Sequence, residues 1–430
     1  MHKNAKVQSV TRIEIGDSIA STEDYTMLLF LTTSAAAAAS TAAIIDLIQM
    51  PSIARPASKV LADLAEQAAL VEGDFSDEPA GIFDVYGNGR WTEEFQTQVA
   101  EDLGKEAGLF MPTGVCAQAA ALSVYAGLPL ASRSALRQSF ITHATSHLLL
   151  WEERSYSDLL GLTAIAAGEK HRPLMAADVE VELKRLRAVG LSPCCIVVEV
   201  PWRELGCTAT PWDELLAMRA LADEYGVPLH MDGARLLEIA PYYQRTPAEV
   251  AALFDSVYVS FYKGLGALSG AMLLGSARFV AAAAPWRRRL GGNAYTSLPM
   301  ALSCRAAYDA HRDSFEARWH ALRRAAAAIV ALDGRVRFEP AEPQCCHAAV
   351  YVAADADALV AARDAALEQT GVRVFRRLRA EGVGEGGREC YWEWLVGPDH
   401  CREWLVDELG DELVLGAWRA FLAALPPGED

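Results

Sequence analysis

The fold of this 430-residue chain is decided by the stretch Leu229–Gly275. It contains LHMDGAR at residues 229–235, VYVSFYKGLGA at residues 257–267 and the apolar run AMLLG at residues 271–275. The first two motifs each place one charged group, Asp232 or Lys263, where an apolar strand gives way to a glycine-rich turn. In a parallel sheet, ligands bind at the carboxyl ends of the strands. We therefore expect Asp232 and Lys263 to meet at one ligand site.

A carboxylate and an amine delivered by neighbouring strands suit a cofactor that has a basic ring nitrogen and an aldehyde. Pyridoxal 5′-phosphate (PLP) has both groups, and its recurring protein partners are a Schiff-base lysine and an acid on the pyridinium nitrogen. The competing interpretation makes Asp232 a turn cap and Lys263 a solvated lysine. A lysine after five mostly apolar strand residues is rarely only solvated, so the sequence favours the catalytic interpretation.

At these motifs a family resemblance emerges. Asp232–Arg235 (DGAR) and Lys263–Gly266 (KGLG) resemble the threonine aldolase and β-eliminating lyase family of PLP enzymes. The resemblance runs from about Asp46 to about Val396. It implies PLP fold type I: an α/β large domain with a mostly parallel seven-stranded sheet flanked by helices, and a smaller C-terminal α/β domain. The expected divisions are an extension at 1–45, a large domain at 46–310 with an entry segment at 46–80, and a small domain at 311–430.

The local patterns agree with alternating strands and helices. Helical spacing predicts helices over Ser58–Leu70, Thr92–Leu103 and Pro211–Tyr225, and one or two long helices over Met300–Leu332. Apolar runs predict buried strands over Cys194–Val200 and Pro228–Met231. Strand–helix–strand alternation of this kind is typical of a parallel sheet.

Composition limits the possible partners. The formal net charge of −17 disfavours nucleic-acid binding. Nine cysteines without zinc-like spacing predict no metal site and fit a reduced, cytoplasmic location; Cys345-Cys346-His347 reads as a buried strand. Thr26–Ile45 is long and apolar, but it is rich in Ser and Thr, so we expect no membrane span there.

One turn has the character of an anion site. The segment Phe110–Ala117 (FMPTGVCA) reads as a strand, a small-residue turn and an Ala-rich helix, which brings free backbone N–H groups to a helix N-terminus. A plain helix start would look the same. The resemblance implies that Thr113, Gly114 and Val115 cradle the PLP phosphate, with Val115 in place of the family's threonine.

A histidine segment adds a second cofactor contact. Ser146–Glu152 (SHLLLWE) resembles a family segment whose histidine stacks on the PLP ring, which assigns that role to His147. An isolated histidine of this kind would more often be a satisfied buried side chain. His143, four residues upstream, is either a bystander or a second acid/base group.

Four further residues are expected at the substrate. Arg235 is placed to bind the ring O3′ or the substrate carboxylate. Arg388 begins a segment that resembles the family's late strand, whose arginine binds the α-carboxylate; arginine suits this role because its planar fork binds a carboxylate bidentately. Tyr86 lies in a turn that resembles the family's Val-Tyr-Gly. Arg203 would recognise an anionic group, although a surface salt bridge fits the sequence equally well.

The resemblance implies a PLP-dependent lyase whose small-molecule substrate is an amino acid. The first hypothesis is threonine aldolase-like cleavage, or formation, of the Cα–Cβ bond of a β-hydroxy-α-amino acid, giving glycine and an aldehyde, with His147 or a water as the base. The second is β-elimination, β-replacement or another specialised biosynthetic reaction on a modified amino acid, since Val115, Tyr262 and Tyr295 depart from the family pattern. The least favoured is an inactive PLP-binding partner subunit. A homodimer or homotetramer with the active site at the subunit interface is also implied.

Overall fold

The computed structural model describes residues 45–46, 56–74, 84–127, 138–380, 390–398 and 408–427. All of them belong to one compact unit, Ile45–Asp430. The extension predicted at 1–45 lies almost entirely outside the described residues, and so does the apolar stretch Thr26–Ile45 except for its last residue. Arg388 also lies outside them.

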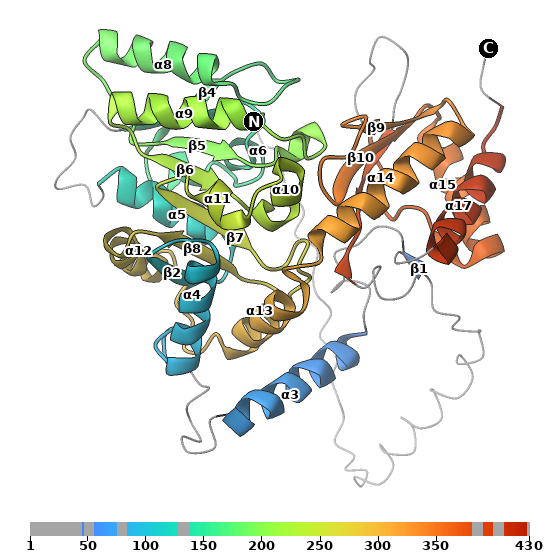
Figure 1. The fold of residues 1–430 in the computed structure, drawn as a ribbon, viewed down its shortest axis with the longest axis horizontal. Helices are drawn as coiled ribbons and strands as arrows, with labels where there is room; N and C mark the ends of the chain where they lie inside the picture. The colour runs from blue at the N-terminus through green and yellow to red at the C-terminus, as the bar shows by residue number, and fades with distance from the viewer. Residues whose placement is uncertain are drawn as a thin grey trace, which may run out of the picture. The chain divides into compact units, whose positions relative to one another are not determined.

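A mostly parallel sheet of seven strands forms the centre of the fold (Figure 1), as the sequence predicted. The strand order is β2-β8-β7-β6-β5-β3-β4, and β8 alone runs against its neighbours. Its strands are β2 (Ala107–Met111), β3 (Ser139–His143), β4 (Thr163–Ala167), β5 (Ile196–Glu199), β6 (Leu229–Asp232), β7 (Ser256–Ser260) and β8 (Ala271–Gly275).

Helices pack on both faces of this sheet. The helices within and around it are α3 (Ala57–Asp74), α4 (Arg90–Asp102), α5 (Gly114–Tyr125), α6 (His147–Leu150), α7 (Ser155–Asp158), α8 (Ala176–Ala188), α9 (Trp212–Tyr225), α10 (Leu236–Tyr243), α11 (Pro247–Ala251), α12 (Ala277–Arg289) and α13 (Leu298–His311), with a 3-10 turn at Arg203–Leu205. The helices predicted near 58–70, 92–103 and 211–225 are confirmed as α3, α4 and α9.

Strand periodicity divides the side chains between the two faces. Successive strand residues point to opposite faces. In β6, Leu229 and Met231 therefore pack in the main hydrophobic core with α4, α8 and α9, whereas His230 and Asp232 point to the face that α5 covers. In β7, Tyr258 packs in a second cluster with α5 and α12. The polar side chains of the central strands thus gather beneath α5.

A second, antiparallel sheet has the order β12-β13-β10-β9. The C-terminal part contains α14 (Phe315–Leu332), β9 (Val336–Glu339), β10 (His347–Val352), α15 (Ala356–Thr370), β11 (Val372–Arg373), β12 (Arg379–Ala380), β13 (Cys390–Leu395) and α17 (Glu408–Ala423), and β11 pairs with β1 (Ile45–Asp46). The long region 300–332 forms two helices, α13 and α14. The domain boundary at 310/311 stays a prediction.

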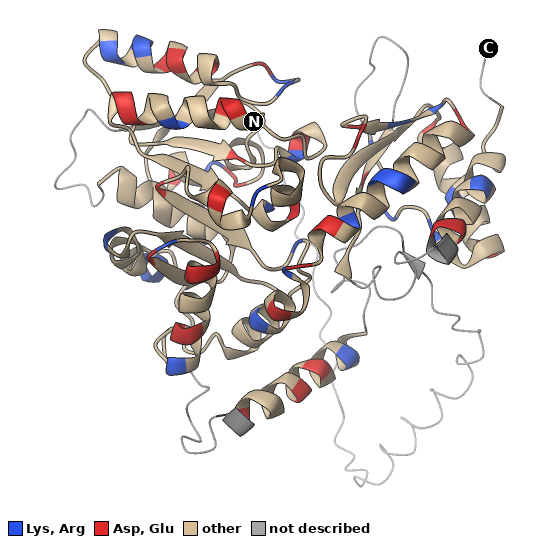
Figure 2. Ribbon diagram, viewed as in Figure 1, with Lys and Arg blue, Asp and Glu red and all other residues tan. Residues whose placement is uncertain are grey.

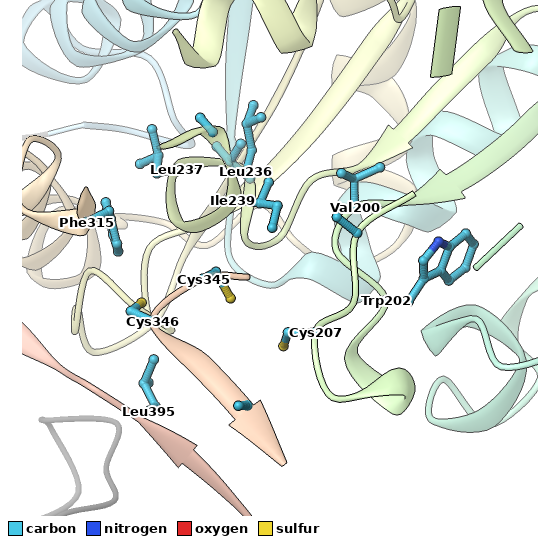
Figure 3. Packing of buried hydrophobic residues seen from close by; sticks show 14 of the residues in the cluster. Val200, Trp202, Cys207, Leu236, Leu237, Ile239, Phe315, Cys345, Cys346 and Leu395 are labelled. Atoms are coloured by element: carbon cyan, nitrogen blue, oxygen red, sulfur yellow. The ribbon is translucent and has the colours of Figure 1, made fainter. Parts of the chain in front are cut away.

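Buried side chains connect the two sheets through one apolar cluster. Figure 3 shows Leu236 and Ile239 of α10, Phe315 of α14, and Cys345 and Cys346 just before β10 within this cluster. All of these side chains are fully buried or nearly so, and neither cysteine forms a disulfide. The segment predicted as a buried strand at Cys345-Cys346-His347 is therefore buried, and β10 begins at its last residue.

Charged residues lie mainly on helices and loops (Figure 2). Against that background, the buried carboxylates Glu199 and Asp232 stand out, because they close two adjacent strands, β5 and β6, and lie opposite each other in the sheet register. Buried carboxylates are costly unless they are paired or hydrogen-bonded. Their position makes the carboxyl edge of the sheet the candidate functional region.

Candidate active site

Asp232 ends β6 and is held by two hydrogen bonds. Its side chain is only 3% exposed. The Oδ2 atom accepts a 2.7 Å hydrogen bond from Nε2 of Gln118, which lies on α5. The Oδ1 atom accepts a longer 3.2 Å bond from the Ala234 amide, an Asx-type turn that follows from the sequence DGA. The carboxylate is therefore fixed in orientation while some of its lone pairs remain available.

Lys263 follows β7 by three residues and is half-buried. Burial is the largest effect on its amine, followed by the nearby Arg235 guanidinium, and together they lower its pKa to about 8. Asp232, Glu199 and Glu238 raise the pKa and offset part of this shift. Its Nζ makes no hydrogen bond within the described part of the chain. An amine with this pKa is partly neutral at physiological pH, which a nucleophile or a base requires.

The turn before α5 has the geometry expected of an anion site. Thr113 is the N-cap, and its Oγ1 accepts a 3.1 Å bond from the Cys116 amide. The amides of Gly114 and Val115 have no acceptor within the helix, because the first N–H groups of a helix never do. A Cβ at Gly114 would overlap the Tyr258 hydroxyl, so only glycine fits there. Val115 is 39% exposed and open to a ligand.

His147 is held by two acids that lie far apart in the sequence. Its backbone amide donates to Oε2 of Glu199 at 2.9 Å, and its Nδ1 lies 3.0 Å from Oε1 of Glu152. Burial raises the pKa of both carboxyls, to about 7 for Glu199. The Oε2 of Glu152 is buried and has no partner among the described residues. His147 keeps its Nε2 available for a ligand.

His143, in contrast, has no ring nitrogen available. Its Nδ1 lies 2.8 Å from the Thr145 hydroxyl, and its Nε2 lies 2.8 Å from the Glu169 carbonyl oxygen. The ring packs against Trp202 at the end of the main core. Of the two interpretations that the sequence left open, the structure favours the bystander.

Arg235 lies beside Lys263 at the boundary with the second sheet. Its Nε donates a 3.2 Å bond to Nδ1 of His347, the first residue of β10, and lies 4.0 Å from Oε2 of Glu238. Glu238 accepts a 3.1 Å bond from the Gly264 amide, which anchors the turn after Lys263. Within the described residues, the terminal nitrogens of Arg235 form no hydrogen bond, so they can bind a ligand.

Arg203 is already paired with carboxylates. Its Nη1 donates to Glu204 at 2.8 Å, and its Nη2 lies 2.8 Å from Oε1 of Glu393 on β13. The guanidinium also lies over the Trp151 ring. Arg379 reaches the same Glu393 oxygen at 3.5 Å. Both terminal nitrogens of Arg203 are engaged, which corresponds to the salt-bridge interpretation of this residue.

Tyr86 lies apart from these groups. Its backbone has a φ of 56°, and its amide donates a 2.8 Å bond to the Tyr295 carbonyl. The two rings pack edge to face, and the Arg288 guanidinium lies over the Tyr86 ring. No contact with Asp232 or Lys263 is present among the described residues. Within a single copy of the chain, Tyr86 therefore does not join the group formed around Asp232 and Lys263.

Asp232 and Arg235 lie near enough to Lys263 to shift its pKa, and His147 binds Glu199, which lies opposite Asp232 in the sheet. The structure also adds partners that sequence reasoning missed. Those partners are Gln118, Glu152, Glu199 and Glu238. One signal was present: Gln118 is a polar residue in the otherwise largely apolar helix GVCAQAAALSVY. A buried polar residue normally has a partner.

Comparison with known families identifies the class. The model of the β-eliminating lyase family matches residues 79–373, well over half of the chain. The chain therefore belongs to the β-eliminating lyase family, and the resemblance found in the sequence is confirmed.

Individual relatives agree with this assignment. Aldolase vrtJ of Penicillium aethiopicum is 29% identical over 60% of this chain and 62% of its own length. A probable low-specificity L-threonine aldolase of Schizosaccharomyces pombe is 29% identical over 48% of this chain and 53% of its own length. The chain thus spans between half and two thirds of these curated relatives. A candidate L-allo-threonine aldolase of Listeria monocytogenes has the same fold, with a TM-score of 0.75 at 28% identity, covering 89% of this chain and 96% of that one.

Proposed function

We propose that this protein is a PLP-dependent lyase that cleaves, or forms, the Cα–Cβ bond of a β-hydroxy-α-amino acid, giving glycine and an aldehyde. The observation that carries the proposal is the pairing of a half-buried amine at Lys263, whose pKa is lowered to about 8, with a fixed, buried carboxylate at Asp232. Family membership and the aldolase relatives support the same reaction class.

The residues present fit PLP group by group. The amides of Gly114 and Val115 have no acceptor within the helix and suit the phosphate dianion, while the Thr113 side chain caps the Cys116 amide. The fixed carboxylate of Asp232 suits a protonated ring nitrogen, and the amine of Lys263 suits the aldehyde. PLP, when bound, supplies that aldehyde and a ring that draws electrons from the substrate Cα.

The low pKa of Lys263 has a direct kinetic consequence. With a pKa of about 8, roughly one amine in ten is neutral at pH 7, against roughly one in 3,000 for an ordinary lysine at 10.5. The lone pair of Nζ is then available to attack a carbonyl or to accept a proton. The fixed Asp232 carboxylate would accept a hydrogen bond from a protonated ring nitrogen.

His147 is the proposed base for the substrate hydroxyl. Its Nδ1 hydrogen is donated to Glu152, which leaves Nε2 as the acceptor of the neutral ring. Glu152 then stabilises the charge that His147 gains on taking the proton. The same flat ring is proposed to stack on the cofactor and so to orient it.

Arg235 is the described residue best suited to bind the substrate carboxylate or the ring O3′, because its terminal nitrogens are available. Arg203 would have to leave Glu204 and Glu393 to do so. Arg388 and Tyr86 remain proposed substrate contacts; Arg388 lies outside the described residues.

A second candidate function is chemistry at the Cα–H bond, as in β-elimination or β-replacement. The lowered pKa of Lys263 favours it, because a neutral amine can remove that proton. The relatives include an alanine racemase of Cochliobolus carbonum at 30% identity. Which bond reacts is set by the orientation of the substrate, and ammonia release would identify elimination.

We also propose a homodimer or homotetramer in the cytoplasm. The eight cysteines of the described residues are all buried and form no disulfide, which supports a reducing compartment. Within those residues, no helix combines the length and the apolar character needed to cross a bilayer.

The test is product release from a panel of β-hydroxy-α-amino acids by PLP-loaded protein, with glycine and aldehyde measured separately. Equimolar glycine and aldehyde from at least one of them supports the aldol reaction, and Lys263→Ala must abolish it. Ammonia and a 2-oxo acid without glycine would replace the proposal with elimination. A protein that binds PLP but gives neither product pair would refute both.

A further inference from the structure

A chain of polar side chains lies behind Asp232, beneath α5. Gln118 of α5 bridges Asp232 and His230: its Nε2 donates to Asp232 at 2.7 Å, and its Oε1 lies 2.7 Å from Nε2 of His230. The other ring nitrogen of His230, Nδ1, lies 2.6 Å from the Ser256 hydroxyl, which lies 2.5 Å from the Tyr125 hydroxyl. Gln118, His230 and Ser256 are fully buried.

The first hydrogen bond of this series, from Gln118 to Asp232, fixes the direction of all the others. The carboxylate of Asp232 can only accept, so Gln118 turns its NH₂ group towards Asp232 and its carbonyl oxygen towards His230. His230 must then donate from Nε2. A flipped Gln118 would oppose its carbonyl oxygen to the carboxylate, which is repulsive.

The far half of the chain follows in the same way. Burial lowers the pKa of His230 to about 4, so the ring is neutral and its Nδ1 accepts the Ser256 hydrogen. The Ser256 oxygen accepts the Tyr125 hydrogen, and burial raises the pKa of Tyr125, which keeps its proton. All four hydrogens are donated towards Asp232, and hydrogen bonds aligned in one direction polarise one another.

We propose that Gln118 and His230 are positioning residues that fix the Asp232 carboxylate and keep it ionised, so that the cofactor ring nitrogen stays protonated. This inference rests on the proposed function, because it needs PLP at Asp232. Neither residue touches the cofactor; each acts through Asp232. Ser256 and Tyr125 extend the chain and fix the tautomer of His230.

The experiment follows the ring nitrogen itself. PLP labelled with ¹⁵N in the ring is bound to the wild-type protein and to Gln118→Met and His230→Phe, and its ¹⁵N chemical shift is recorded against pH. We expect the ring nitrogen of the wild type to be protonated across the neutral range. In Gln118→Met its pKa should fall by about 1 unit or more, and PLP should bind about tenfold more weakly.

Two further variants make the test specific. Tyr125→Phe removes only the distal hydroxyl and should shift the ring-nitrogen pKa in the same direction by a smaller amount. Thr142→Val is the matched control: the Thr142 side chain is equally buried and bonds the Val197 carbonyl at 3.0 Å, outside the chain of donors, so the ¹⁵N titration should not change.

The outcomes distinguish the proposed function from the positioning role of Gln118 and His230. If wild-type protein fails to bind PLP, the proposed function is wrong. If it binds PLP with a protonated ring nitrogen but Gln118→Met and Tyr125→Phe give the wild-type titration, the positioning role is refuted while the proposed function stands. A shift in Thr142→Val as large as that in Tyr125→Phe would assign the effect to general loss of buried polarity and also refute it.

Discussion

Replacing Lys263 by methionine should stabilise the cofactor-free protein. The amine is half-buried, and burial together with the Arg235 charge lowers its pKa to about 8 from 10.5. In the folded state the protonated amine is therefore held in a place that disfavours its charge. Methionine has similar length and no charge, so it relieves this cost while it removes the reactive group.

The magnitude follows from proton linkage. Between pH 8 and pH 10.5 the unfolded chain binds more protons at this site than the folded chain, so the wild-type free energy of unfolding rises with pH in that window. Below pH 8 the full penalty applies, about 3 kcal/mol for the cited shift. Partial exposure of the side chain screens part of it. We expect Lys263→Met to gain about 2–3 kcal/mol at pH 7 and about 1–2 kcal/mol at pH 9.

Urea denaturation of the cofactor-free proteins at these two pH values measures the difference. Lys170→Met, at an exposed position, is the control, and its effect should be small and independent of pH. A Lys263→Met protein that is no more stable than the wild type at pH 7 would contradict the reasoning. So would a gain that does not shrink at pH 9.

Three further substitutions probe separate parts of the structure. Gly114→Ala would force its Cβ against the Tyr258 hydroxyl, so the PLP dissociation constant should rise about tenfold or more, measured by equilibrium dialysis. Glu152→Gln removes the charge beside His147 and should lower kcat about 100-fold with PLP affinity unchanged, measured by aldehyde release. Gly206→Ala, at φ +65° with its Cβ against a backbone carbonyl, should lower the free energy of unfolding by about 3 kcal/mol, measured by urea denaturation.

Matched glycines serve as controls. Gly416→Ala meets open space on α17 and should leave PLP binding unchanged; an equal loss in both variants would show that the crowding at Gly114 is not the cause. Gly226→Ala has a similar backbone, with φ +61°, but open space around it, and should cost only about 1–2 kcal/mol. If Gly206→Ala costs no more than that, the backbone contact contributes nothing.

For Glu152→Gln, an unchanged kcat would show that the Glu152 carboxylate takes no part in the mechanism.

The sequence predicted the parts of the site that are local in the chain. Asp232 and Lys263 each follow an apolar strand, and a strand end followed by glycine is readable from a few residues. The N-cap Thr113 and the first two residues of α5, Gly114 and Val115, were readable for the same reason. Parallel strand order then brings these separate ends to one edge of the sheet.

The partners of these residues were not readable, because their contacts depend on register and on helix rotation. Gln118 and Asp232 are separated by 114 positions, and His147 and Glu199 by 52. Whether Gln118 faces the sheet or solvent depends on how α5 is rotated about its axis, and an Ala-rich helix with little amphipathic pattern does not fix that rotation. Only the packed structure shows which polar side chain meets which.

Arg203 shows that the sequence also does not reveal which charged side chains are paired with one another. Its residue type and its place after β5 suggested an anion site, and the structure supplies an anion, but from the protein: Glu204 and Glu393 occupy both terminal nitrogens. Arg203, Arg235 and Arg379 together with His347 lower the pKa of Glu393 to about 2, so this carboxylate stays ionised at every pH at which the protein would work. A substrate carboxylate would have to displace Glu393 to reach Arg203, whereas at Arg235 it would meet nitrogens without a hydrogen-bond partner in the described structure. We therefore propose that Arg235, rather than Arg203, binds the substrate carboxylate, because Glu393 on β13 already occupies Arg203.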